Sequence, residues 1–277
     1  MAIPAKVEAR LSNGLKRFQP VLAAAKARDV NESDTVVVVM DMLQEVFGYD
    51  KYTEITSEHA IRGTFCDLAV KLNGALSLLI EVKAVGLDLK DAFVKQAVDY
   101  AANQGVDWVV LTNGLRWRVY KVGFAKPISH ELVVELALGE MSPKSDSDLE
   151  LLFMIAKEGW QKAHISDYHT QRQALSRFSL GALLLSDPVV EVLRRELKRM
   201  SPGVRIDLDE LRAVLSQEVL KREILEGEKA EEARKQLSKA AARALRARAR
   251  SESSAAGSPA EGASNEDAAT PEHVAAE

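Results

Sequence analysis

The stretch Leu78-Leu79-Ile80-Glu81-Val82-Lys83-Ala84 places an acidic and a basic side chain inside an apolar run. Successive side chains of a β-strand point to opposite faces of the sheet. Glu81 and Lys83 therefore share one face, while Ile80 and Val82 pack on the other. We expect a strand from 77 to 84 that carries this charged pair, and the segments around it indicate what the pair does.

A second strand-like run, Phe65-Cys66-Asp67-Leu68-Ala69-Val70, precedes the first. Asn73-Gly74 separates the two runs and is a strong signal for a β-hairpin turn. A hairpin brings Asp67 close to the face that carries Glu81 and Lys83. The two runs together therefore predict two carboxylates and one ammonium at one place on a sheet.

These residue types suit phosphodiester hydrolysis. Two carboxylates are enough for Mg²⁺, which proteins usually hold through one or two of them, and the metal makes a bound water more acidic. Lys83 can orient that water or stabilise the charge that develops on the phosphate. Gln96 and Tyr100 stand four residues apart in a helical stretch and share one face. We expect Gln96 to position Lys83 or the scissile phosphate, and Tyr100 to contact the phosphate backbone.

In this order the motifs resemble the PD-(D/E)xK nuclease superfamily, and within it the N-terminal nuclease domain of type I restriction enzyme R subunits. The ordered string is more specific than an isolated E-x-K, because alternating charge is common on the solvent face of a strand. Cys66 stands where the superfamily usually has proline. The resemblance covers roughly residues 25–125, and its matching segments are 31–35, 47–50, 66–68, 80–84, 96–101, 111–117 and 119–120.

The resemblance implies a mixed-sheet nuclease core and a Mg²⁺-dependent reaction, with Mn²⁺ as a substitute. It implies Asp67 and Glu81 as metal ligands, Lys83 as the catalytic lysine, and Gln96 and Tyr100 as the helix motif.

The resemblance also implies an acidic residue on the first core helix. Glu32 is our prediction, because it precedes a threonine and the helix as in the family, and Glu45 is the alternative. R subunits carry an ATP-driven translocase after the nuclease, whereas this sequence has no G-x-x-x-x-G-K-[ST] phosphate loop. We therefore expect a stand-alone nuclease-like domain that does not use ATP.

Five further side chains are candidates for nucleic-acid contact. Arg62, Arg116 and Arg118 are candidates for phosphate contacts. Trp117, like Tyr120, is a candidate for stacking on bases. The ordinary alternatives are solvated arginines and aromatic side chains that belong to the core.

Composition sets broad limits on the class of protein. The 277 residues carry a formal net charge of −4, so DNA binding requires a local basic patch rather than a global field. The single cysteine, Cys66, excludes an intramolecular disulfide and suits a reducing cytoplasm. No apolar run approaches the roughly 18 residues of a membrane helix, so we expect a cytoplasmic protein without a membrane partner.

The predicted order of elements is an α/β (α+β) core, a mixed central sheet flanked by helices, followed by a helical region. The segment from 35 to 47 is ambiguous, because four valines favour a strand, whereas the cap signal at 31–34 and the apolar spacing favour the helix that we predict. The predicted parts are an N-terminal helix in 1–30, the nuclease-like core in 31–125, a connector in 126–145, a helical region in 146–224, a basic helix in 225–250 and a disordered acidic tail in 251–277.

The sequence favours a metal-dependent DNA endonuclease, related by resemblance to restriction and defence. The alternative is a nucleic-acid-binding or adaptor protein that keeps the nuclease fold without cleaving. The strandedness of the substrate, DNA as against RNA, and any recognition sequence stay open. A homodimer is expected because each chain has one site, and a partner subunit is a candidate source of specificity.

Overall fold

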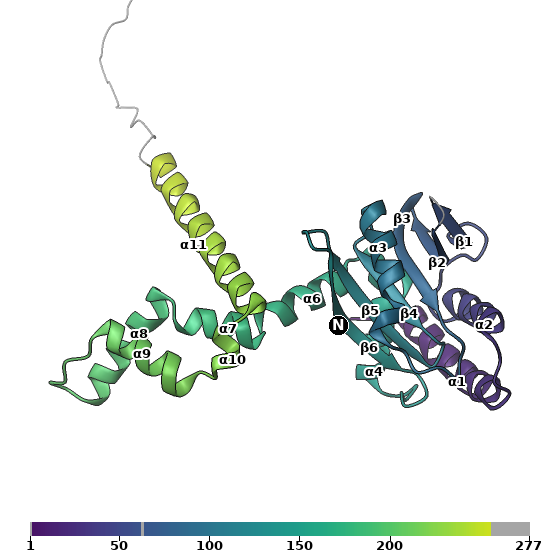
Figure 1. Cartoon of the computed structure of the whole chain (residues 1–277), viewed down its shortest axis with the longest axis horizontal. Coiled ribbons are helices and arrows are strands. Elements are labelled where there is room, and N and C mark those ends of the chain that lie inside the picture. Colours follow the sequence, from purple (N-terminus) through teal and green to yellow (C-terminus); the bar gives the residue numbers. More distant parts are fainter. Residues whose placement is uncertain (1, 62–63, 256–277) are drawn as a thin grey trace, which may run out of the picture. The chain divides into compact units, whose positions relative to one another are not determined.

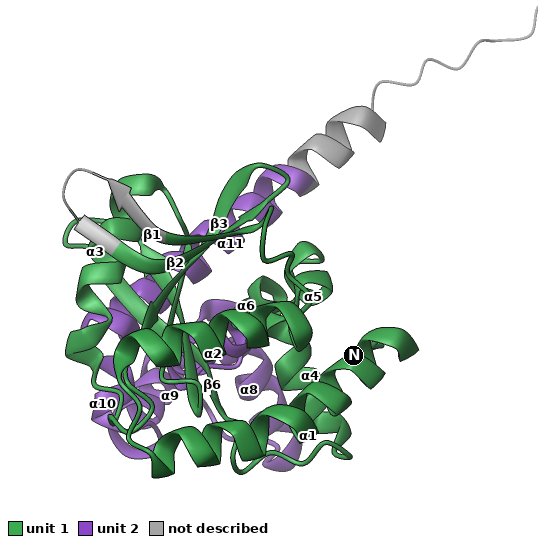
Figure 2. Ribbon diagram, turned by 90° about the vertical axis from the view of Figure 1, so that its right-hand side faces the viewer, with its two compact units in different colours: residues 1–171 green, residues 172–277 purple. Residues whose placement is uncertain are grey.

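The computed structural model describes residues 2–61 and 64–255, and the side chains within 58–65 and beyond 247 are not described. Arg62, one of the predicted phosphate contacts, lies outside the described residues. The chain divides into two compact units, residues 1–171 and 172–277 (Figure 2). The division falls inside the helical region expected from 146 to 224, and the predicted domain boundaries stay a prediction.

A six-stranded mixed sheet forms the centre of the first unit (Figure 1). The strands lie side by side in chain order; β3 and β4 are parallel and every other neighbouring pair is antiparallel. This confirms the predicted fold class. The strands are β1 (Ile55–Ile61), β2 (Thr64–Leu72), β3 (Ala75–Val82), β4 (Trp108–Thr112), β5 (Arg116–Gly123) and β6 (Ser129–Ala137).

Helices cover both faces of this sheet. One apolar core joins a face of the sheet to α1 (Ala5–Ala27), α2 (Glu32–Glu45) and α4 (Asp146–Ile155). A second core joins the other face to α3 (Lys95–Gln104), which follows a short turn, η1 (Asp91–Phe93). The helix α3 also supplies the crossover that parallel neighbours such as β3 and β4 require.

The valine-rich segment is a helix, as predicted. Asn31 caps α2, because its side-chain oxygen accepts a hydrogen bond of 2.8 Å from the backbone N–H of Asp34. Val39, Met42 and Leu43 are buried along one side of the helix. Capping and the apolar face therefore override the β-propensity of the four valines.

The turn between β2 and β3 is the two-residue hairpin that Asn73-Gly74 predicts. Leu72 pairs with Ala75, and Asn73 and Gly74 both have positive φ angles, 53° and 79°. Such turns match the right-handed twist of the flanking strands. The register shifts by one residue between Val70 and Lys71, so the turn and this β-bulge together bring Asp67 on β2 beside Glu81 on β3.

The structure adds detail to the predicted parts. Within the connector expected at 126–145 the run 131–136 favours a short strand, and β6 lies there, because this edge strand pairs along nearly the full length of β5. Within the expected helical region, the sequence predicts a helix near 165–184, and the structure has two helices there, since Ser176 caps a new one. The last helix continues to Ala255, into the segment expected to be a tail from residue 251. Residues 256–277 of that expected tail lie outside the described residues.

The remaining helices follow the sheet along the chain. Among the helices of the described residues, none is long and apolar enough to cross a membrane. Their bounds are α5 (Lys157–Gln161), α6 (His164–Ala174), α7 (Arg177–Leu184), α8 (Asp187–Met200), α9 (Leu208–Val214), the π-helical turn η2 (Leu215–Val219), α10 (Arg222–Leu225) and α11 (Glu228–Ala255).

Candidate active site

Asp67 and Glu81 are brought together by the hairpin register. Leu68 pairs with Ile80, which places Asp67 on β2 beside Glu81 on β3. The Asp67 carboxylate also acts as an acceptor for the backbone of β3: its Oδ2 accepts a hydrogen bond of 2.7 Å from the backbone N–H of Val82. Asp67 is therefore held to the strand that carries Glu81.

Lys83 completes the cluster just beyond the end of β3. Its backbone N–H donates to the carbonyl of Thr112 at 2.8 Å, which continues the pairing with β4. Its Nζ donates to Glu81 Oε1 at 2.8 Å and lies 3.4 Å from both carboxylate oxygens of Glu32. One ammonium thus bridges carboxylates from the sheet and from α2.

Burial perturbs every member of this cluster. Desolvation raises the pKa of Asp67, and the hydrogen bond from Val82 opposes the rise. Desolvation likewise raises the pKa of Glu81, against the hydrogen bond from Lys83. For Lys83, burial works to lower the pKa, but the bond to Glu81 and the neighbouring carboxylates outweigh it and raise the pKa. Such a group of shifted side chains is typical of functional sites.

The structure favours Glu32 over Glu45 as the acid of the first core helix. Glu32 stands in the first turn of α2 and lies against the Lys83 ammonium. Glu45 is in the last turn of the same helix, where it forms an ion pair with Arg17 of α1. Only Glu32 thus contacts the cluster.

Two polar side chains that the sequence prediction missed hold the loop after Lys83. The Thr35 hydroxyl on α2 accepts a hydrogen bond of 3.1 Å from the backbone N–H of Val85. Asn113, after β4, donates to the carbonyl of Leu87 at 2.8 Å. The described residues with buried polar side chains are Thr35, Glu81, Thr112 and Asn113, and all four lie around the carboxyl ends of β3 and β4, where sites in α/β sheets form. Their sequence signals are a threonine in a helix's first turn and an asparagine before glycine.

The helix motif divides into an exposed and a buried residue. Gln96 is exposed in the first turn of α3. Tyr100 is only 3% exposed and belongs to the core beneath α3, as does Cys66. Direct contact of Tyr100 with a phosphate backbone, as predicted, conflicts with this burial. Cys66 is equally enclosed: burial raises the pKa of its thiol to about 12, which makes it a packing residue rather than a nucleophile.

Two predicted nucleic-acid contacts, Arg116 and Arg118, already have partners within the fold. Arg116 forms ion pairs with Glu135 and Glu140. Arg118 pairs with Glu135 and donates to the carbonyl of Leu89 at 2.8 Å. The assignment of both arginines to phosphate is therefore not favoured by the geometry.

The prediction that Trp117 stacks on bases was wrong. Trp117 is 0% exposed, its ring lies 5.0 Å from that of Phe47, and its Nε1 donates to the carbonyl of Gly114. Tyr120 is also buried, and its hydroxyl donates to Asp91. The face of β5 that carries Trp117 is the one covered by α1 and α2, so a base cannot reach the ring.

The donor set at the cluster suits a hard divalent cation. Within the described residues no group of three or more His, Cys, Asp and Glu side chains is arranged to hold a metal, so the set is limited to the carboxylates of Asp67 and Glu81. Each of their hydrogen bonds uses one oxygen, and a carboxylate has two. Mg²⁺ needs no more than one or two carboxylates, because it keeps several waters.

Residues 37–134 match the family model described as type I restriction enzyme R protein N terminus. The match begins in the second turn of α2, includes β1 to β5 and ends within β6. It therefore contains Asp67, Glu81 and Lys83. The resemblance seen in the sequence is confirmed over this segment. Among curated proteins and among solved structures nothing matches the chain.

Proposed function

We propose that this chain is a divalent-metal-dependent DNA endonuclease. Over residues 37–134 it is similar to the N terminus of type I restriction enzyme R proteins. The proposed reaction is hydrolysis of phosphodiester bonds, in restriction or another defence against foreign DNA. One observation carries the proposal. The β2–β3 hairpin brings Asp67 to Glu81 and Lys83, and the three side chains meet at the end of β3, which is parallel to β4.

The roles follow from chemistry and position. Asp67 and Glu81 would hold Mg²⁺ or Mn²⁺, and the bound ion would supply a more acidic water and offset negative charge on the phosphate. Lys83 keeps its proton at neutral pH, since its pKa is raised. Its ammonium is therefore a fixed positive charge for a phosphate oxygen on which charge develops. Glu32 holds the Lys83 side chain from the side of α2.

Partners follow the same reasoning. The matched family is named for the R protein of type I restriction enzymes. By extension, we propose for this chain a DNA substrate and a partner subunit that supplies sequence specificity. The homodimer expected from the sequence stays a prediction. The competing function is a protein that binds nucleic acid with this fold and does not cleave, and the following experiment separates the two.

The test is conversion of supercoiled plasmid to nicked and linear forms by the purified chain with Mg²⁺ or Mn²⁺. The site variant is Asp67→Asn, which keeps the side-chain shape and removes the charge. The matched control is Asp99→Asn, the same exchange at an exposed position on α3.

We expect metal-dependent nicking by the wild type and by Asp99→Asn, with loss of nicking in Asp67→Asn. Equal nicking by Asp67→Asn would place the activity elsewhere or in a contaminant. Absence of nicking by the wild type on plasmids of several modification states, with DNA binding retained, would favour the non-cleaving protein.

A further inference from the structure

The last helix carries a row of basic side chains along one side. Lys235, Lys239, Arg243 and Arg246 on α11 are all exposed. At 3.6 residues per turn their spacing of four, four and three residues keeps them within about 80° of arc. With 1.5 Å of rise per residue the row extends for about 16 Å. We call these four residues the basic row.

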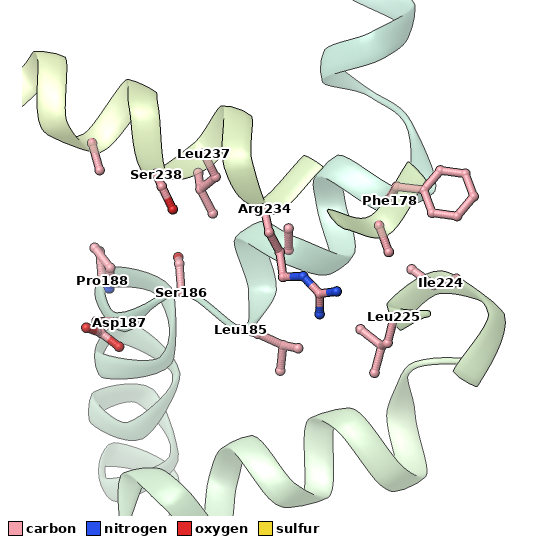
Figure 3. A pocket seen from close by; sticks show the side chains of 13 residues that line it. Phe178, Leu185, Ser186, Asp187, Pro188, Ile224, Leu225, Arg234, Leu237 and Ser238 are labelled. Carbon is pink, nitrogen blue, oxygen red and sulfur yellow. The ribbon is translucent and has the colours of Figure 1, made fainter. Parts of the chain in front are cut away.

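The opposite side of α11 faces its own unit. Ala230 and Ala233 are buried where α11 packs on α7. Ala230, Arg234, Leu237, Ser238 and Ala241 line a pocket of about 410 Å³, together with residues of α7, α8 and α10. Figure 3 shows Arg234, Leu237 and Ser238 directed from α11 toward this pocket. On a helical wheel the pocket side lies about 150° from the basic row, so the row faces away from the unit.

The charges of the basic row have few compensating groups. From residue 233 to residue 250 the sequence has no Asp or Glu. For three of the four basic side chains, therefore, no acid stands three or four residues away in the helix. Lys235 is the exception, because Glu231 and Glu232 stand four and three residues before it. Like charges at such spacing destabilise an isolated helix. In contrast, the basic side chains of α8 alternate with acids: Arg194 pairs with Glu191, and Arg199 with Glu196.

We propose that the basic row is a sequence-independent docking surface for the phosphate backbone of duplex DNA, an inference that rests on the proposed function for its choice of DNA as the ligand. A row of about 16 Å extends past several phosphates of one strand, which follow each other at about 3.4 Å along the duplex axis. Long, flexible lysine and arginine side chains contact such a backbone without reading bases.

The row does not suit a membrane surface. A helix that lies in the membrane interface buries large apolar side chains on the side opposite its charges. The opposite side of α11 carries alanines, Arg234 and Ser238 beside the leucines Leu237 and Leu245, and its first part packs within its own unit. A partner with regularly spaced negative charge and no demand for apolar contact fits the row, and duplex DNA is such a partner.

The test measures binding of the full chain to a short labelled duplex between about 50 and 200 mM salt, without divalent metal so that no cleavage occurs. The row variant replaces Lys235, Lys239, Arg243 and Arg246 with glutamine, which keeps helix propensity. The matched control replaces Arg194, Arg195, Lys198 and Arg199 of α8 with glutamine and removes the same charge. A second control exchanges lysine and arginine at the four positions of the row.

Each neutralised phosphate contributes about 0.9 to the slope of log K against log salt, so loss of the row should reduce the slope by about 3.6. The α8 variant and the Lys–Arg exchange should keep the wild-type slope. An unchanged slope in the row variant, an equal reduction in the α8 variant, or binding to anionic vesicles in place of duplex DNA would overturn the proposal. Cleavage plays no part in this binding measurement. If the wild type cleaves DNA but the row variant keeps the wild-type slope, the docking proposal fails and the proposed nuclease function stands. If the row variant loses slope but the wild type does not cleave, the nuclease function fails and the docking proposal stands.

Discussion

The ammonium of Lys83 lies 2.8 Å from Oε1 of Glu81, two residues earlier in the chain, although both side chains are largely shielded from solvent. Removing one member of such a buried pair leaves the other charge without its partner. The pair is placed by the last residues of β3 and by the bond from Lys83 to Thr112 on β4. Its position at the end of two parallel strands links the fold to the proposed chemistry.

Lys83→Met should abolish plasmid nicking while the chain stays folded. Loss of one electrostatic contact to a developing charge lowers a rate by about 10²–10³-fold, and methionine keeps most of the volume. The matched control is Lys71→Met, the same exchange near the other end of β2. Nicking rates and urea unfolding measured on both variants separate the two effects. Equal rates for the two variants would remove Lys83 from the proposed machinery.

Thr35→Val should destabilise the chain by about 1–3 kcal/mol, because a buried N–H of Val85 loses its acceptor. Thr35→Ser should restore most of the loss, since serine keeps the hydroxyl. The control is Thr170→Val on α6, whose hydroxyl is exposed and bonds within its own helix. Urea midpoints for the three variants check the prediction, which fails if Thr35→Val and Thr170→Val shift the midpoint equally.

Gly48→Ala should destabilise the chain more than Gly74→Ala. Both glycines have left-handed backbone angles, with φ of 82° and 79°, so both exchanges carry a backbone cost of about 1 kcal/mol. At Gly48 an added Cβ would also lie 2.6 Å from the guanidinium carbon of Arg10, whereas at Gly74 no atom lies within 4 Å. The difference between the two urea midpoints isolates the clash, and similar midpoints would show that Arg10 moves aside freely.

The Arg10–Glu158 ion pair should make stability depend on pH. The hydrogen bonds from Arg10, at 2.6 and 2.8 Å, hold the pKa of Glu158 below its usual range. A lowered pKa in the folded state means that the contribution is complete above the usual carboxyl pKa and is lost as pH falls through the lowered value. Glu158→Gln should therefore be less stable than the wild type near pH 7 and nearly equal to it at strongly acidic pH. A gap between the two that is independent of pH would contradict this coupling.

Local sequence patterns predict the centre of the site well. Alternation along β3 puts Glu81 and Lys83 on one side, and Asn73-Gly74 fixes the hairpin that adds Asp67. These relationships depend on residues close in sequence and on one tight turn. The β-bulge between Val70 and Lys71, which the placement of Asp67 also needs, has no signal in the alternating pattern. Over residues 37–134 the match to the type I restriction enzyme R protein N terminus agrees with the resemblance that the ordered motifs carry.

The parts that failed depend on contacts between distant segments. The aromatic ring of Trp117 is buried because α1 and α2 cover its face of the sheet, and alternation along β5 cannot tell a covered face from an open one. The supports at Thr35 and Asn113 act across 50 and 28 residues on the loop near Val85. Such long-range hydrogen bonds leave no periodic signal, although the residue types at both positions are typical of caps and turns.

The most direct test of the central claim is the rate of plasmid nicking as a function of Mn²⁺ concentration, for the wild type and Glu81→Gln side by side. The account predicts that the wild-type rate rises and saturates with Mn²⁺, while Glu81→Gln, which loses one of two carboxylate ligands, shows no metal-dependent nicking over the same range. Matching curves for the two proteins would contradict the claim that Asp67 and Glu81 hold the catalytic metal beside Lys83.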